Sequence, residues 1–317
     1  MLTIFSTPKP FRGHIEIIQR NAIQSWKRLD PGVEVILIGD EGGTAEVARE
    51  FGLRHEPTVR RNEHGTKYLG YIFERAEEVA RHDLLCYVNC DILLTSDFRA
   101  ALERVMRWRR NFLMVGRRWD TNIGSPLDFS QPGWEAELRS LALQQNHQRP
   151  PQWIDYFVFT RGLYSKKIPP FVIGRPGWDN WLVWFARASR VSVVDASRVV
   201  IAVHQNHDYS YHPQGEQGVW QGEEAQQNYK LLGGWRRFRT IENATHRLTH
   251  DGIQLNLRHW YALAKRAALQ ESSNTWFAFL NATRRVRHRF GLRQENVRRL
   301  SRGSAGAGPG GPGNPQS

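Results

Sequence analysis

The first ninety residues alternate between two hydrophobic patterns. Continuous apolar runs at 2–7, 33–39 and 84–89 predict buried strands, and the segments between them have apolar side chains at helical spacing. Three helices are predicted in these segments, at 15–29, 44–52 and 69–79. This order predicts an α/β fold with a mixed, mostly parallel, Rossmann-like sheet that is flanked by helices on both faces.

The pattern changes after Asp91. Further strands are predicted at 112–116, 155–160, 191–195 and 199–203, and helices at 97–109 and 179–189. A connection rich in Trp, Pro and Asp follows the first of these strands. Because no repeat or linker interrupts the chain before residue 290, residues 1–250 are predicted to form one domain.

The C-terminal part has a different composition. Residues 251–300 are predicted to form a basic helical extension, and the Gly- and Pro-rich residues 301–317 a disordered tail. The chain has a net charge of +13, of which residues 281–317 contribute +7 through eight arginines and one glutamate. Aromatic residues accompany the basic ones in the extension. Such a segment either packs against the preceding domain or makes peripheral contact with an anionic membrane, and both interpretations stay open.

The compartment can be predicted from what the sequence lacks. The first residues have neither the basic region nor the apolar stretch of a signal peptide, and no run approaches the roughly 18 apolar residues of a membrane helix. Cys86 and Cys90 are predicted to share one strand and do not form a disulfide framework. These features predict a cytoplasmic protein.

Polar side chains follow each of the three N-terminal strands. They are Ser6-Thr7, Asp40 and Asn89-Cys90-Asp91. Because ligands of open α/β sheets bind at the carboxyl ends of strands, these residues are candidates for binding a nucleotide or a metal ion. The loop 60–67, with Thr66 and Lys67, either contacts the same ligand or is merely solvated. The G-x-G-x-x-G and P-loop motifs are absent from the sequence, so a nucleotide would be bound by another arrangement.

The segment IGRPGWDNWLVWFA, residues 173–186, places Asp179 at the start of a predicted helix between Trp178 and Trp181. Aspartate is a preferred N-cap residue. A carboxylate beside aromatic faces can also bind and deprotonate a sugar hydroxyl. Capping and catalysis are compatible, and the sequence supports both interpretations.

The segment VVIAVHQNHDYSYH, residues 199–212, ends a predicted strand at His204 and then adds His207, Asp208 and His212. Neutral imidazole is a common ligand for transition metals. Three histidines and an acid within nine positions therefore predict a metal site, with His204 and His207 as ligands. No cysteine pair accompanies them, which argues against a zinc finger.

These motifs and their order resemble those of glycosyltransferases of the GT-A fold, the nucleotide-diphospho-sugar transferase superfamily, in a family 2-like form. The resemblance spans residues 1–215. It implies that Asn89-Cys90-Asp91 matches the short acidic motif that ends the fourth strand in this family and holds Mn²⁺ or Mg²⁺. It also implies that Asp179 is the base of an inverting enzyme and that His204 or His207 completes the metal site.

Asn89 departs from the family pattern, which commonly has a second Asp at this position. Strand alternation predicts that the side chains of Asn89 and Asp91 point the same way and that Cys90 points the opposite way. Because the amide brings no charge, we expect a weaker metal site that depends more on His204.

The resemblance implies an enzyme that transfers a hexosyl or related glycosyl group from a nucleotide-diphosphate donor to an acceptor hydroxyl with divalent-metal assistance. The expected donor contacts are Ser6, Thr7, Asp40, Thr66, Lys67 and Asn89. The expected sugar or acceptor contacts are Asp155, Trp178 and Asn180, with a surface turn as the alternative interpretation of Asp155. The acceptor stays open between a glycan, a lipid-linked molecule and a small molecule.

Two other functions are alternatives. A sugar nucleotidyltransferase has a similar scaffold, but the segment STPKPFRGH, residues 6–14, has only one glycine, unlike the Gly-rich phosphate loop of such enzymes. A non-catalytic nucleic-acid-binding protein would use the basic tail. No recognisable nucleic-acid-binding motif in the sequence supports that function.

Overall fold

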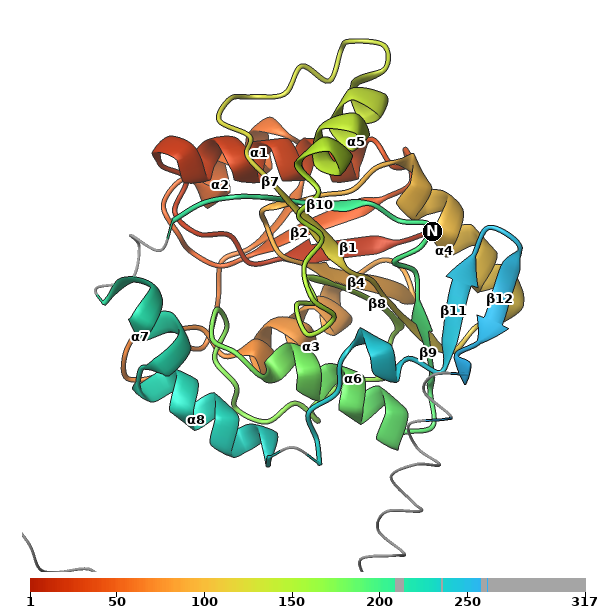
Figure 1. Ribbon diagram of the computed structural model, residues 1–317. Coiled ribbons are helices and arrows are strands. Elements are labelled where there is room, and N and C mark those ends of the chain that lie inside the picture. The colour runs from red at the N-terminus through yellow and green to blue at the C-terminus, as the bar shows by residue number, and fades with distance from the viewer. Residues whose placement is uncertain (209–213, 235, 258–260, 262–317) are drawn as a thin grey trace, which may run out of the picture. The chain divides into compact units, whose positions relative to one another are not determined.

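A sheet of nine strands forms the centre of the protein in the computed structural model, which describes residues 1–208, 214–234, 236–257 and 261 (Figure 1). The described residues up to 257 belong to one compact unit, Met1–Trp260. The strand order is β12-β11-β9-β6-β8-β4-β1-β2-β3. These strands are β1 (Thr3–Ser6), β2 (Glu34–Ile38), β3 (Arg54–Glu56), β4 (Leu84–Val88), β6 (Phe112–Val115), β8 (Tyr156–Thr160), β9 (Ser192–Asp195), β11 (His246–Thr249) and β12 (Gly252–Leu255).

Most neighbouring strands of this sheet are parallel. β1 pairs in parallel with β2 and β4, and β9 pairs in parallel with β6 and β11. β8 lies antiparallel between β4 and β6, and β11 and β12 form an antiparallel hairpin at one edge. The predicted fold class, a mixed and mostly parallel α/β sheet, is confirmed.

Helices cover both faces of the sheet (Figure 1). Trp26, Ala48 and Phe98 of α1, α2 and α4 pack on one face, and Phe73 and Leu182 of α3 and α6 pack on the other. Burial of both faces explains the continuous apolar runs in the strands. The helical elements are α1 (Gly13–Lys27), α2 (Thr44–Glu50), α3 (Leu69–Val79), α4 (Ser96–Trp108), α5 (Trp134–Gln145), α6 (Trp178–Ala188), α7 (Gly215–Gln221), α8 (Glu223–Leu232) and the 3-10 turn η1 (Ile241–Asn243).

A second sheet has three short strands in the order β5 (Ile92–Leu93), β10 (Ala202–Gln205) and β7 (Arg118–Thr121). The strand predicted at 199–203 starts later, at Ala202, because the amides of Val199 and Val200 both donate to the Ala196 carbonyl in a turn. Neither β5 nor β7 was predicted from the sequence. Together the three strands cross the end of the main sheet that carries the polar residues after β4.

Helix α1 anchors this small sheet through polar side chains on its buried face. The fully buried Trp26 donates its indole N–H to the Ile92 carbonyl at 2.8 Å, and Asn21 donates to Gln205 at 3.0 Å. Ile92 lies opposite His204 in the antiparallel pair, and the Gln205 amide donates to the Asp91 carbonyl. In that register the Ile92 carbonyl points away from β10, so the Trp26 indole satisfies it.

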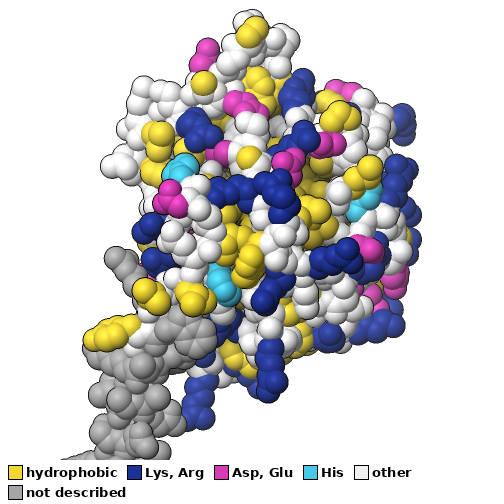
Figure 2. All heavy atoms as spheres, turned by 90° about the vertical axis from the view of Figure 1, so that its right-hand side faces the viewer, with side chains coloured by type: hydrophobic (Ala, Val, Ile, Leu, Met, Phe, Trp, Pro, Cys, Tyr) yellow, Lys and Arg dark blue, Asp and Glu magenta, His cyan; other side chains and the backbone are white. Residues whose placement is uncertain are grey.

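Two predictions for the C-terminal part, the boundary at 250/251 and the helical extension, can be compared with the structure in part. The hairpin β11–β12 crosses the predicted boundary at 250/251, and β12 is a strand where a helix was predicted from Ile253. The rest of the basic extension and the tail 301–317 lie outside the described residues, as does the predicted membrane contact. Within the described ranges, no helix has both the length and the apolarity needed to cross a membrane. On the face around α4 and the hairpin, Lys and Arg side chains outnumber Asp and Glu (Figure 2).

We expect Trp26→Phe to lower the free energy of unfolding by about 2–4 kcal/mol, because it leaves the buried Ile92 carbonyl unpaired and creates a cavity. Chemical denaturation would measure the loss. The matched control is Trp108→Phe at a partly exposed position, which should change stability by less than about 0.5 kcal/mol. Equal losses in the two variants would contradict the anchoring role of Trp26.

Candidate active site

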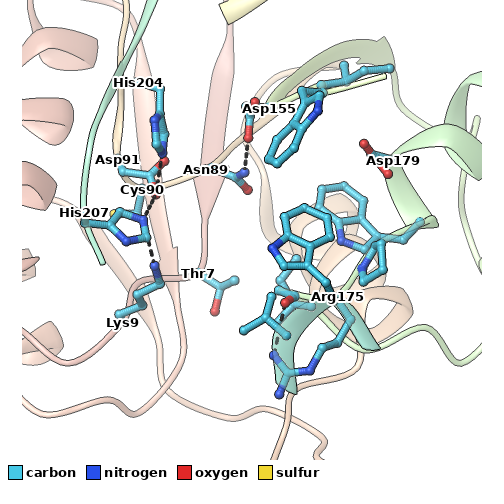
Figure 3. Close-up of a pocket in the computed structure, with 18 of the residues that line it drawn as sticks. Thr7, Lys9, Asn89, Cys90, Asp91, Asp155, Arg175, Asp179, His204 and His207 are labelled. Atoms are coloured by element: carbon cyan, nitrogen blue, oxygen red, sulfur yellow. Dashed lines mark hydrogen bonds and ion pairs between the residues drawn. The ribbon is translucent and has the colours of Figure 1, made fainter. Parts of the chain in front are cut away.

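A cavity of about 1590 Å³ lies at the carboxyl ends of β1 and β4, bounded by the loops before α6 and α7 (Figure 3). Every predicted site residue except Ser6 and Asp40 lines it. The residues that the fold brings together here are Thr7, Thr66, Lys67, Asn89, Asp91, Asp155, Trp178, Asp179, Asn180, His204 and His207. Figure 3 shows Asp91 with the two histidines on one side and Asp179 on the other.

Three of the predicted metal ligands converge on one point. Nε2 of His207 lies 3.2 Å and Nε2 of His204 lies 3.9 Å from Oδ2 of Asp91. One potential ligand atom from each residue lies within 4.8 Å of the others. The small sheet produces this arrangement, because Asp91 directly precedes β5 and His204 lies opposite Ile92 on β10. We call Asp91, His204 and His207 the triad.

The surroundings of both imidazoles favour a metal-binding tautomer. Nδ1 of His204 lies 3.2 Å from a carboxylate oxygen of Asp120, and Nδ1 of His207 lies 2.7 Å from the Asp208 carbonyl. When a cation is bound, these contacts favour a proton on Nδ1 of each neutral ring and leave both Nε2 lone pairs for the cation, whereas in the free protein Nε2 of His207 lies within hydrogen-bonding distance of Asp91. Oδ1 of Asp91 is buried without a hydrogen-bond partner. Two lone pairs and a buried carboxylate facing one another fit a divalent cation.

The pKa of Asp91 lies well below its usual range. Burial alone would raise it, but His204, His207 and Lys9 outweigh that effect. The pKa of Asp120 is also lowered, since His204 and Arg118 outweigh its burial. Both side chains are therefore carboxylates at neutral pH, as a metal ligand and its supporting acceptor must be.

Asn89 does not share the orientation of Asp91. Strand β4 ends at Val88, and the Ile92 amide donates to the Asn89 carbonyl, so residues 89–91 form a turn. The prediction from strand alternation is wrong for this reason. The Asn89 side chain instead donates to Asp155 at 2.6 Å and accepts from the Tyr87 hydroxyl at 2.9 Å (Figure 3).

Asp155 is buried, with 5% of its surface exposed, so the surface-turn interpretation is wrong. Its two carboxylate oxygens accept from Arg118 at 2.9 and 3.0 Å. Arg118 also donates to Asp120, at 2.9 Å. Asp155 thus lines the cavity as part of a buried salt-bridge network. Through Arg118 this network includes Asp120, the carboxylate beside His204.

Asp179 is the second residue of α6, and the N-cap is Gly177, whose φ of 96° suits glycine. The interpretation of Asp179 as N-cap is therefore wrong. Burial, together with the Asp155 carboxylate, raises the pKa of Asp179 to about 7, although the backbone amides of Asn180 and Ile154 act against the shift. A carboxyl group with a pKa near 7 suits a general base at neutral pH.

The predicted donor-binding residues have different surroundings. The Thr7 hydroxyl lines the cavity and is buried without a hydrogen-bond partner. Lys67 is buried and forms an ion pair with Glu41 at 2.7 Å. Ser6 is buried below the cavity floor and donates to the Val88 carbonyl, and Asp40 is exposed outside the cavity and paired with Arg61. The structure thus brings Thr7, Thr66 and Lys67 to the cavity and leaves Ser6 and Asp40 outside it.

Trp178 and Asn180 line the cavity from the start of α6, but both are largely buried. The Trp178 ring packs edge-on against Tyr87 with centroids 5.6 Å apart. The Asn180 amide donates to the Arg239 carbonyl at 2.9 Å. These contacts hold the N-terminal turn of α6, and with it Asp179, against the sheet.

Several cavity residues were not predicted from the sequence. Lys9 lies two residues beyond Ser6-Thr7 and Glu41 one residue beyond Asp40, so the position after a strand was the available signal. Asp120 and Arg118 lie on β7, which has no apolar run. Other unpredicted cavity residues include Arg149, Trp153, Arg175, Trp220 and Glu224, which lie on loops and on the helices α7 and α8.

Neither a protein-family model nor a curated protein matches this sequence. Solved structures with a similar chain path include glucosyl-3-phosphoglycerate synthase from Mycobacterium tuberculosis with Mn²⁺, UDP and glucosyl-3-phosphoglycerate. That match has 16% identity and a TM-score of 0.42, and it covers 75% of this chain and 80% of that chain. S. aureus TarS 1–349 matches with 12% identity and a TM-score of 0.44, over 64% of this chain and 60% of that chain. At these values the similarities assign neither a family nor an activity.

We expect Mn²⁺ to bind the wild-type protein and to lose measurable affinity in Asp91→Asn and His204→Ala, which remove one ligand each. Asp120→Asn should lower the affinity by about 10–100-fold, because it removes the carboxylate that orients His204. Titration of free Mn²⁺ by electron paramagnetic resonance would measure this. Asp128→Asn, at a fully exposed carboxylate, is the control. Unchanged affinity in Asp91→Asn would contradict the assignment of the triad.

Proposed function

We propose that this protein transfers a glycosyl group from a nucleotide-diphosphate sugar to an acceptor hydroxyl with the help of a divalent cation. The observation that carries the proposal is a pair of carboxyl groups on opposite sides of one cavity. Asp91 has a strongly lowered pKa beside two imidazoles, whereas Asp179 has a pKa of about 7. Two such groups suit different tasks, one to bind a cation and one to move a proton.

Asp91, His204 and His207 would hold the cation. When bound, it neutralises negative charge on the diphosphate leaving group. Two imidazole ligands favour Mn²⁺ over Mg²⁺, because Mg²⁺ prefers oxygen ligands. Asp120 orients His204 from behind by lying 3.2 Å from its other ring nitrogen.

The donor would occupy the part of the cavity between the triad and the ends of β1 and β2. The unpartnered Thr7 hydroxyl is available there to a ribose or a phosphate. Thr66 and Lys67 line the same region, and Lys67 is fixed by Glu41 and by the Pro8 carbonyl. Asn89 contributes by holding Asp155, since its amide protons point at that carboxylate.

Asp179 would act as the general base. The Ile154 amide and the first turn of α6 position its carboxylate. It lies across the cavity from the triad (Figure 3), where an acceptor hydroxyl can approach the sugar from the side opposite to the leaving group. A single displacement of this kind inverts the configuration at the anomeric carbon.

The acceptor would enter between the loop 150–154 and α7. Trp153 and Trp220 line this part of the cavity with ring centroids 4.9 Å apart. Aromatic rings beside the proposed base suit a sugar acceptor, because apolar ring faces pack against the C–H groups of a pyranose. Asp155, Trp178 and Asn180 then shape the pocket from below through the contacts described above.

A thermal-shift panel of UDP-, GDP-, dTDP- and CMP-sugars, with and without Mn²⁺, tests donor binding. We expect at least one nucleotide class to raise the melting temperature only when Mn²⁺ is present, because a ligand that binds the folded state stabilises it by mass action. The effect should disappear in Asp91→Asn and persist in Asp128→Asn. Absence of Mn²⁺-dependent stabilisation by all four classes would contradict the proposed function.

With the donor identified, the pH dependence of transfer tests the base. Asp179 must be ionised to accept a proton, and burial raises its pKa to about 7. The rate should therefore increase about tenfold per pH unit below pH 7 and level off above it. Asp179→Asn should lose about 10²–10⁴-fold in turnover and keep Mn²⁺-dependent donor binding. A rate that stays constant down to pH 5 would argue against Asp179 as the base.

A further inference from the structure

Lys9 lies against the triad, and the mechanism above gives it no role. Its Nζ atom is 3.1 Å from Nε2 of His207, the same nitrogen that faces Asp91. The side chain lines the cavity and attracts Asp91 electrostatically (Figure 3). Nε2 of His207 therefore cannot accept a hydrogen bond from Lys9 and ligate a metal ion at the same time.

The backbone of Lys9 is held in this place. Gln19 of α1, which is almost fully buried, accepts from the Lys9 amide at 2.7 Å and donates to the Lys9 carbonyl at 2.9 Å. Lys67 donates to the preceding carbonyl, that of Pro8, at 3.1 Å. Because these bonds fix the main chain, a change at the triad can displace only the flexible side chain of Lys9.

The charges around Asp91 disfavour the binding of a divalent cation while the Lys9 ammonium remains in place. Asp91 is the one carboxylate of the triad, and the Lys9 ammonium already compensates it. A divalent cation at the same atoms would lie within a few ångströms of that ammonium in a partly buried site, where repulsion between like charges is stronger than in bulk water. The diphosphate of a donor would relieve the repulsion, since it offers the displaced ammonium a new anionic partner in the cavity.

We propose that Lys9 makes the binding of the divalent cation and of the nucleoside diphosphate cooperative. Its ammonium group lies beside Nε2 of His207 in the free protein, moves away when the cation binds, and then neutralises the diphosphate. The cation alone must displace Lys9 without compensation, and therefore binds weakly until the diphosphate is present. This inference rests on the proposed metal site and assigns Lys9 as a positioning residue for the donor.

Calorimetric titrations of the full chain with Mn²⁺ alone, with UDP alone and with UDP at saturating Mn²⁺ would test the proposal, with GDP in a parallel series. We expect Lys9→Met to bind Mn²⁺ alone about tenfold more tightly than the wild type and to bind the diphosphate at saturating Mn²⁺ about tenfold more weakly. The factor by which each ligand improves the affinity of the other should fall accordingly, because coupling between two ligands is reciprocal.

Lys9→Arg, which keeps the charge, should retain most of the coupling, and Lys166→Met at a highly exposed position should behave like the wild type. Thermal unfolding of each variant verifies that it is folded. Mn²⁺ affinity that is unchanged or lower in folded Lys9→Met overturns the role of Lys9, even if the wild type transfers sugar. If Lys9→Met shows the expected changes in Mn²⁺ and diphosphate affinity but the wild type transfers no sugar, the role of Lys9 is supported and the transferase function is rejected. If neither the wild type nor Lys9→Met binds Mn²⁺, both the role of Lys9 and the proposed function are overturned.

Discussion

The partial burial of Asp91, whose side chain is 15% exposed, is the constraint on which the rest of the site depends. A carboxylate that is removed from water needs cationic or hydrogen-bonding partners, because its desolvation is otherwise too costly. The fold supplies them from segments distant in sequence, with His204 and His207 beside the carboxylate and Lys9 next to His207. The small sheet sets the register of β5 against β10, and Trp26 anchors that sheet to α1. The architecture around the triad can thus be understood as the means by which one buried charge is compensated.

The sequence predicts those parts of the molecule whose chemistry is local. The central strands have continuous apolar runs because both faces of their sheet are buried, and Asp91 and His204 are recognisable as acid and imidazole at strand ends. β5 is apolar but only two residues long, and β7 has no such run, since each owes its conformation to pairing with β10, which is distant in the chain. The burial of Asp155 was not predictable because its partner Arg118 lies on β7. The orientation of Asn89 was mispredicted because strand geometry ends at Val88.

The pKa values of Asp91 and Asp179 differ because of the partners of each carboxyl group and not because of its burial. Burial acts in the same direction on Asp91 and Asp179, raising the pKa of each. Around Asp91, two imidazoles and an ammonium group reverse that effect. Around Asp179, backbone amides offset it only in part, and the nearby Asp155 carboxylate adds to it. A divergence of this kind depends on cationic partners next to Asp91, and on the pairing of Arg118 with Asp120 and Asp155, which keeps that guanidinium bound to other carboxylates.

The same network explains why an amide occupies position 89. The Asn89 side chain donates a hydrogen bond to Asp155 over 2.6 Å, and a carboxylate at that position has no proton to donate at neutral pH. An aspartate there would place a second acid against Asp155, whose partner Arg118 is already shared with Asp120. The cost of that repulsion in a buried site would exceed the benefit of one more charge near the triad, from which residue 89 points away. The missing acid of the Asn-Cys-Asp motif is therefore a consequence of Asp155, and the triad compensates through its two histidines.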